Sequence, residues 1–89
     1  MVRYRVLITG QVQGVEFRAA CRRMAVQYGV HGWVRNRPDG RVEAAFEGAA
    51  EDVGRLLDWV RSGPQHAVVT DVAVRAERPE GLGTFLIRY

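Results

Sequence analysis

Lysine is absent from this sequence, and several other reactive residue types are scarce. All thirteen basic residues among the 89 are arginine, which excludes Schiff-base chemistry, a catalytic lysine and a Walker-type phosphate lysine. The only serine, Ser62, precedes Gly63-Pro64, so a Ser-His-Asp nucleophile is not expected. The only cysteine, Cys21, excludes an intrachain disulfide, and one cysteine with two histidines does not favour a structural zinc site.

Long apolar segments are also missing, since no run approaches the roughly 20 residues of a membrane span. The first residues lead into a strand-like pattern rather than a signal peptide. Together with the lone cysteine, this predicts a cytoplasmic protein. Residues 1–89 are enough for one domain, which we expect to act as a monomer, but not for a large multi-substrate enzyme. The net charge of +3 favours anionic partners such as phosphate compounds.

Hydrophobic periodicity predicts five strands and two helices. Apolar and polar residues alternate in five segments that we expect to form strands: residues 4–9, 33–37, 42–47, 72–76 and 85–89. In the third strand, Glu43 and Glu47 fall opposite the apolar residues, which predicts a solvated face there. One apolar stripe predicts a helix over residues 17–28 that Gly29 ends, and a second stripe predicts a helix that Gly48 opens.

The resulting order, β-α-β-β-α-β with a short extra strand at the C-terminus, predicts an α+β fold. It is the ferredoxin-like βαββαβ sandwich, in which two helices cover one face of a single antiparallel-rich sheet. A right-handed crossover makes the first two strands parallel, so both end at the same edge of the sheet. Because many functions use this fold, the prediction of function rests on the residues at that edge.

The loop between the first strand and the first helix has the features of an anion site. Gly10 and Gly14 allow a loop whose backbone N–H groups point inward. The loop ends at a helix N-terminus, where free N–H groups and the helix dipole favour an anion. Arg18 falls in the first helical turn, and its guanidinium can reach over the loop to grip two phosphoryl oxygens. A tight turn beside a solvated arginine is the alternative interpretation.

Asn36, the only asparagine, is a second candidate at the same edge. It shares strand parity with Val34, which places it on the helix side of the sheet, and a neutral amide there can bind a water molecule. The alternative is an asparagine that stabilises the entry to the turn at Pro38-Asp39-Gly40. The two histidines, His31 and His66, have no paired ligand or nucleophile, so we expect structural roles for both.

Two signatures in this sequence resemble those of the acylphosphatase family. The first, aliphatic-x-Gly-x-Val-Gln-Gly-Val-x-Phe-Arg, is met in full from Ile8 to Arg18. The second, Gly-aromatic-Val-x-Asn-x-x-x-Gly-x-Val with a further glycine, is met from Gly32 to Val42 and at Gly48. The length and the order of elements also agree with the family, so the resemblance covers essentially the whole chain.

The resemblance implies a hydrolase of acyl phosphates, such as acetyl phosphate or carbamoyl phosphate, that releases a carboxylate and inorganic phosphate. It implies that no metal or cofactor takes part. Arg18 would bind the phosphate and Asn36 would position the attacking water, as the two catalytic residues. The resemblance further implies that backbone N–H groups surround the phosphoryl oxygens, and these groups would belong to Gln13, Gly14, Val15, Glu16 and Phe17.

Two positions that the first signature leaves unspecified bear on phosphate affinity. Gln11 stands where many members of the family carry a basic residue, and Glu16 places a carboxylate inside the loop, where small or aromatic residues are common. A carboxylate within a Debye length of about 8 Å repels a bound phosphate unless it points to solvent. It also suits the positive end of a helix. Weaker substrate affinity is the consequence to test.

Two other classes of function fit parts of the pattern. A module that binds phosphate or carbamoyl phosphate without turnover would use the same loop and arginine. An RNA-binding sheet of the RRM type shares the order of elements, but it stacks bases on aromatic residues of its central strands. The Lys/Arg-Gly-aromatic signature of that class is absent here. We therefore expect a small-molecule substrate, and neither a nucleic acid nor a membrane as a partner.

Overall fold

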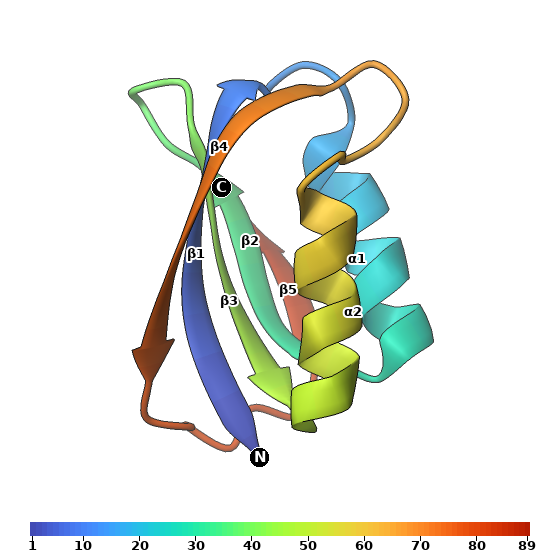
Figure 1. Ribbon diagram of the computed structural model, residues 1–89, viewed down its shortest axis with the longest axis vertical. Helices are drawn as coiled ribbons and strands as arrows, with labels where there is room; N and C mark the ends of the chain where they lie inside the picture. The colour runs from blue at the N-terminus through green and yellow to red at the C-terminus, as the bar shows by residue number, and fades with distance from the viewer.

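The computed structural model describes all 89 residues and confirms the predicted order of five strands and two helices. The strands are β1 (Val2–Gln11), β2 (His31–Asn36), β3 (Val42–Gly48), β4 (Val68–Glu77) and β5 (Phe85–Arg88). The helices are α1 (Phe17–Tyr28) and α2 (Ala50–Val60). Both helices cover one face of the sheet and leave the other face open (Figure 1), which confirms the ferredoxin-like α+β fold. Neither helix is long and apolar enough to cross a membrane.

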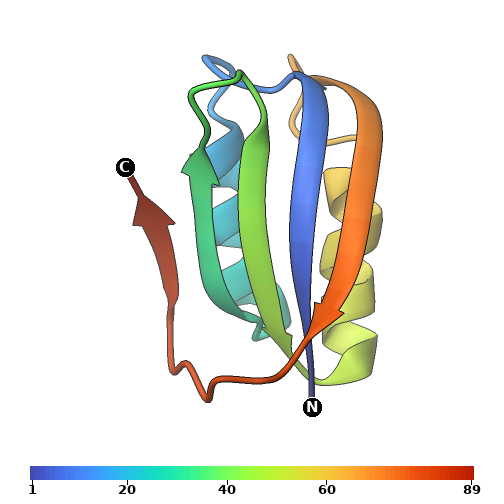
Figure 2. The ribbon, with the colours of Figure 1, turned by 90° about the vertical axis from the view of Figure 1, so that its left-hand side faces the viewer.

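The five strands form one mixed sheet in the order β4-β1-β3-β2-β5 (Figure 2). β3 lies between β1 and β2 and pairs antiparallel with both, so β1 and β2 run parallel, as the right-handed crossover predicted. β5 pairs in parallel with β2. Three strands, β1, β2 and β5, therefore run in the same direction, and their carboxyl ends lie at one edge of the sheet.

The core lies between the sheet and the helices and follows the predicted periodicity. Val42, Ala44 and Phe46 on β3 are fully buried, because alternate residues of a strand face the same side. Cys21 on α1 joins the same cluster, and burial raises the pKa of its thiol. Gly29 ends α1 with a left-handed φ of 70°, as the sequence predicted.

The prediction of a solvated face on β3 is wrong for Glu43 and Glu47, which are only 8% and 1% exposed. Arginines from neighbouring strands cover both carboxylates. Glu43 pairs with Arg5 at 3.1 Å and with Arg35 at 2.6 Å, and Glu47 lies 3.5 Å from Arg3. Alternation shows which side of the sheet these residues face. It does not show that long side chains from other strands pair across that side and exclude water.

Most strand boundaries differ from prediction by one or two residues, and two boundaries have a clear structural cause. Gly48 does not open a helix, because it is the last residue of β3, and α2 begins at Ala50 with Ala49 as its N-cap. β4 begins at Val68 rather than at residue 72, because it continues to pair with β1 beyond a register shift before Gly10. Both boundaries depend on which strand lies alongside, which local periodicity does not reveal.

Candidate active site

A cavity of about 340 Å³ lies at the edge of the sheet where β2 and β5 end and α1 begins. We call it the edge cavity. Arg18 and Asn36, predicted from different segments, both line it, together with Gly14, Glu16 and Phe17 of the predicted loop. Because β1 and β2 are parallel, their carboxyl ends lie at the same edge of the sheet, and the segments that follow them therefore lie close together. In open sheets, ligands commonly bind beside the carboxyl ends of strands.

The β1–α1 loop, residues 12–16, is anchored in the core at both ends by buried Val12 and Phe17. Within it, Gly14 has φ +76° and Glu16 has φ +61°, and these two left-handed residues turn the chain into the helix. The N–H groups of residues 13–16 donate to no carbonyl or side chain of the protein, and no side chain caps α1. Four backbone donors at a helix N-terminus are therefore free to bind an anion.

Arg18 adds a guanidinium that forms no ion pair. Its Cζ lies 4.9 Å from the centre of the Tyr89 ring, a cation–π contact. Arg5, on the open face of the sheet, is instead held by carboxylates on both sides. Because no carboxylate pairs with the guanidinium of Arg18, its N–H donors remain available for the oxygens of a phosphoryl group.

Asn36 is the last residue of β2 and is half-buried. It lines the edge cavity on the helix side of the sheet, as its parity with the buried Val34 predicted. Its side-chain oxygen Oδ1 is buried and accepts no hydrogen bond within the protein. A buried acceptor without a partner costs about 1–3 kcal/mol, so this oxygen is suited to accept a hydrogen bond from a bound molecule.

Glu16 lines the edge cavity and is exposed, and its carboxylate forms no ion pair. It is the N-cap residue of α1 and the one residue other than glycine with positive φ. Its side chain makes no capping hydrogen bond. The predicted carboxylate at the loop is therefore present beside the free N–H groups, and no cation neutralises it.

Ile87 and Tyr89 also line the edge cavity, and sequence reasoning missed both. Ile87 pairs with Val34 because β5 runs parallel to β2, and this register brings the end of the chain to the cavity. The only signal in the sequence was the alternation of Phe85, Ile87 and Tyr89, which predicts a shared face. It does not reveal which strand β5 lies beside.

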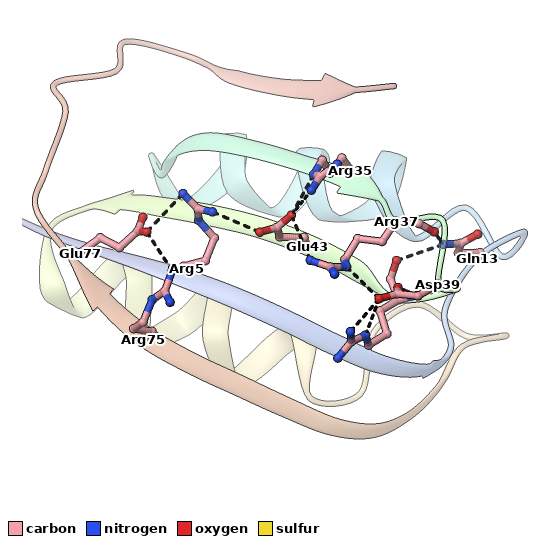
Figure 3. A network of polar contacts seen from close by, with 9 residues as sticks. Arg5, Gln13, Arg35, Arg37, Asp39, Glu43, Arg75 and Glu77 are labelled. Carbon is pink, nitrogen blue, oxygen red and sulfur yellow. Dashed lines mark hydrogen bonds and ion pairs between the residues drawn. The ribbon is translucent and has the colours of Figure 1, made fainter.

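Gln13 takes part through its side chain, a role that sequence reasoning also missed. Its Nε2 donates to the carbonyl oxygens of Arg37 at 2.8 Å and Arg41 at 3.0 Å (Figure 3). Both acceptors lie in the hairpin turn, residues 37–41, which follows Asn36. Gln13 and Val15, predicted with the other loop residues, do not line the edge cavity. Their backbone N–H groups lie in the loop beside it and stay candidates for anion binding.

The open face of the sheet differs from a base-stacking surface. Trp33 is buried there between the guanidinium groups of Arg5 and Arg88, whose Cζ atoms lie 5.0 and 4.6 Å from the ring centre. His31 has the structural role predicted for it, since its Nδ1 lies 2.7 Å from the carbonyl oxygen of Leu82. No group of three or more histidine, cysteine, aspartate or glutamate side chains is placed to hold a metal ion.

Comparison with known proteins agrees with this geometry. A sequence model of the acylphosphatase family matches residues 4–87. The chain is 58% identical over 84 residues to an acylphosphatase of Gloeobacter violaceus. The aligned residues cover 94% of this chain and 90% of that protein. The fold matches the crystal structure of acylphosphatase from Bacillus subtilis with a TM-score of 0.96, at 39% identity over 100% of both chains. An acylphosphatase from Coxiella burnetii matches with a TM-score of 0.94 at 32% identity, over 98% of this chain and 92% of that one.

The family match spans nearly the whole chain, and it includes both the β1–α1 loop and the end of β2. The β1–α1 loop and the end of β2, which both line the edge cavity, are thus the segments that carry the two signatures. This chain belongs to the acylphosphatase family and is an acylphosphatase, a hydrolase of acyl phosphates.

Proposed function

We propose that hydrolysis takes place in the edge cavity, where Arg18 and the β1–α1 loop bind the phosphoryl group and Asn36 holds the attacking water. One observation carries this proposal: an unpaired guanidinium and an unpartnered amide oxygen line the same cavity, beside free backbone N–H groups. Phosphoryl transfer depends on positioning and on charge stabilisation more than on covalent help from the protein. These groups supply both.

The phosphoryl group binds at the N-terminus of α1. Backbone N–H groups of residues 13–17 donate to its oxygens, and the guanidinium of Arg18 grips two of them. As the bond between phosphorus and the bridging oxygen breaks, that oxygen leaves with the electron pair as a carboxylate. Donors that are already oriented stabilise the charge of the transition state without further rearrangement.

Asn36 positions the water. Its Oδ1 accepts a hydrogen bond from one water O–H, which directs a lone pair of the water oxygen toward phosphorus. As the new P–O bond forms, the water transfers its proton to a non-bridging oxygen of the phosphoryl group. A protein base is not needed because the phosphoryl oxygen takes the proton, and a strong general acid is not needed because the carboxylate is already a good leaving group. The step uses no metal and no cofactor.

Hydrolysis of benzoyl phosphate in the presence of EDTA tests this mechanism. We expect turnover by the parent, a loss of about 10³-fold or more in kcat/KM for Arg18→Ala, and a loss of about 10²- to 10³-fold for Asn36→Ala. Arg23→Ala, which removes an exposed guanidinium from α1, is the matched control and should stay within about twofold. Inhibition by inorganic phosphate should weaken in Arg18→Ala and persist in Asn36→Ala.

Four results would contradict the proposal. Turnover that EDTA abolishes would mean that a metal takes part. Parent-like activity in folded Arg18→Ala would place the chemistry elsewhere. A pH profile that requires a protein base with a pKa of about 6–7 would rule out proton transfer to the substrate. If the parent binds phosphate without turnover, and Arg18→Ala abolishes that binding, the cavity is a binding module.

The proposal extends to the organisation of the protein. Residues 1–89 form one acylphosphatase-like domain that acts as a monomer in the cytoplasm. One cluster of buried residues joins the sheet to both helices, and exposed apolar residues such as Val26, Val68 and Leu86 lie on separate elements. The free thiol of Cys21 suits a reducing compartment. Light scattering should give a mass of 10.0 kDa, and twice that mass at micromolar concentration would contradict the monomer.

A further inference from the structure

Two of the segments that line the edge cavity come from strands that are not neighbours in the sheet. The β1–α1 loop follows β1 and Asn36 ends β2, while β3 lies between these two strands. No backbone hydrogen bond joins the loop to Asn36 or to the hairpin turn. The sheet therefore does not by itself fix the distance between the phosphate-binding N–H groups and the amide that holds water.

The side chain of Gln13 spans this gap. Both hydrogens of its amide group are used, one toward the carbonyl oxygen of Arg37 and the other toward that of Arg41. Both partners are carbonyl oxygens, which only accept hydrogen bonds, so the atom that faces them must be the amide nitrogen. The two bonds hold the amide group in one orientation. Because Arg37 directly follows Asn36 in the chain, the bridge ends one residue from the water-positioning side chain.

The hairpin turn to which Gln13 binds is internally braced. Arg37 N donates to Arg41 O at 2.8 Å, and Gly40 N donates to Arg37 O at 3.1 Å. Asp39 accepts hydrogen bonds from Arg41 and Arg37. These bonds, that of the Arg41 side chain foremost, hold the pKa of Asp39 well below its usual range. Arg37 also lies 3.8 Å from Glu43 of the ion-pair network on the open face, so the turn is a firm support.

We infer that Gln13 is a positioning residue, whose side-chain bridge sets the distance and orientation of the β1–α1 loop relative to Asn36. This inference rests on the proposed function. Phosphate binding needs only the loop and Arg18, which lie in one continuous segment. Attack by water requires the loop and Asn36 to be held at the right distance and orientation. A misplacement of about 1 Å can cost about 10²-fold in rate. Loss of the bridge therefore lowers kcat and spares the affinity for phosphate.

Two variants break the bridge in different ways. Gln13→Met keeps the length of the side chain but has no N–H donor, and Gln13→Asn keeps the amide on a chain that is one methylene shorter. Gln27→Met, at an exposed position on α1, is the matched control. We expect kcat for benzoyl phosphate to fall about 10- to 100-fold in both Gln13 variants. The inhibition constant for inorganic phosphate should stay within about twofold of the parent value, and Gln27→Met should match the parent in both quantities.

The outcomes separate the inference from the proposed function. An unchanged kcat in the Gln13 variants overturns the inference, and so does a parallel loss of kcat, phosphate affinity and folding stability, which would indicate a purely structural role. If the parent has no turnover, the proposed function fails, and NMR with saturating phosphate decides on the bridge. Gln13→Met should then shift or broaden the side-chain amide signals of Asn36, whereas Gln27→Met should leave them unchanged. Unshifted Asn36 signals in Gln13→Met would overturn the bridge.

Discussion

Glu16 combines a strained backbone with a negatively charged side chain beside the edge cavity. With φ 61° and ψ 29°, it occupies the left-handed region, where a side chain costs about 1 kcal/mol relative to glycine. Glu16 lines the edge cavity with Arg18, and its carboxylate forms no ion pair. Glu16 therefore places a negative charge near the loop to which the proposed mechanism assigns the phosphoryl group.

Replacing Glu16 by glycine should relieve both effects. We expect Glu16→Gly to lower KM for benzoyl phosphate about 2- to 5-fold at low salt, as removal of one nearby unit charge would. The rate constant kcat should change little, because the proposed mechanism gives the carboxylate no role toward the water or the leaving group. The free energy of unfolding should rise by about 1 kcal/mol. Steady-state kinetics at low and high ionic strength measure the first effect, and urea unfolding measures the second.

Glu16→Gln separates the two causes, since it removes the charge but keeps a side chain in the left-handed region. It should lower KM without raising stability. A KM that is unchanged or raised in Glu16→Gly would show that the carboxylate does not repel the substrate.

On the scale of elements, two glycines permit close packing between strands. A Cβ on Gly32, which has φ +141° in β2, would lie 1.8 Å from the carbonyl oxygen of Ala45 on β3. A Cβ on Gly10, which has φ +135°, would lie 2.0 Å from the carbonyl oxygen of Val68 on β4. The sequence predicts Gly10 in a loop, where glycine provides conformational freedom. The structure shows a second requirement, since Gly10 belongs to β1 at the register shift with β4.

Gly32→Ala should destabilise the protein strongly. The added methyl group would collide with backbone atoms that cannot move without breaking the β2–β3 pairing, so we expect a loss of about 3 kcal/mol or more. Gly54→Ala is the matched control, because nothing lies within 4 Å of its added Cβ on α2. It should stabilise the helix by about 1 kcal/mol. Urea unfolding measures both, and a Gly32→Ala midpoint at or above that of the parent would refute the prediction.

On the scale of the whole molecule, one buried carboxylate holds the segment that crosses the end of the sheet. β4 and β5 are the two outermost strands of the sheet, so the chain between them must pass below the ends of the other strands (Figure 2). Glu47 accepts the N–H groups of Glu80, Gly81 and Leu82 at 2.7, 2.8 and 3.1 Å. Buried Arg3 balances its charge. This clamp places β5, and with it one wall of the edge cavity.

The clamp makes stability depend on pH in a defined direction. Burial alone would raise the pKa of Glu47, but the three backbone donors and the Arg3 guanidinium outweigh it, so the pKa lies below its ordinary value. Because the folded-state pKa lies below the unfolded value of about 4.3, the ionised carboxylate stabilises the folded state fully above that pH. The contribution is lost as pH falls through the folded-state pKa. Glu43 adds to the same trend, since hydrogen bonds from Arg35 and Arg5 outweigh its burial and lower its pKa.

We therefore expect the free energy of unfolding to fall below about pH 4–5, and Glu47→Gln to weaken this dependence. At pH 7 the variant should lose about 3 kcal/mol, because Arg3 loses its buried partner and one amide oxygen replaces two carboxylate oxygens. Exposed Glu51→Gln is the control and should change stability by less than about 0.5 kcal/mol. Urea unfolding at several pH values measures both. An acid decline as steep in Glu47→Gln as in the parent would mean that other carboxylates cause it.

Local pattern was sufficient for much of this protein. The order of the elements follows from periodicity, because burial of one face repeats every two residues in a strand and every 3.6 in a helix. The parallel direction of β1 and β2 follows from the crossover that joins them. Arg18 and Asn36, which both line the edge cavity, could be predicted as site residues because each stands in a signature next to a glycine-dependent turn. Short-range constraints of that kind depend on consecutive residues.

Contacts between distant residues were decided only in the tertiary structure. Glu47 was predicted to be solvated, and it is buried because Arg3 and the segment before β5 close over it. Tyr89 reaches the edge cavity because β5 pairs with β2 rather than with another strand. Gln13 bridges to the hairpin turn because the ends of β1 and β2 lie one strand apart. Each of these depends on which strands become neighbours, and that choice minimises the free energy of the whole chain rather than of any local segment.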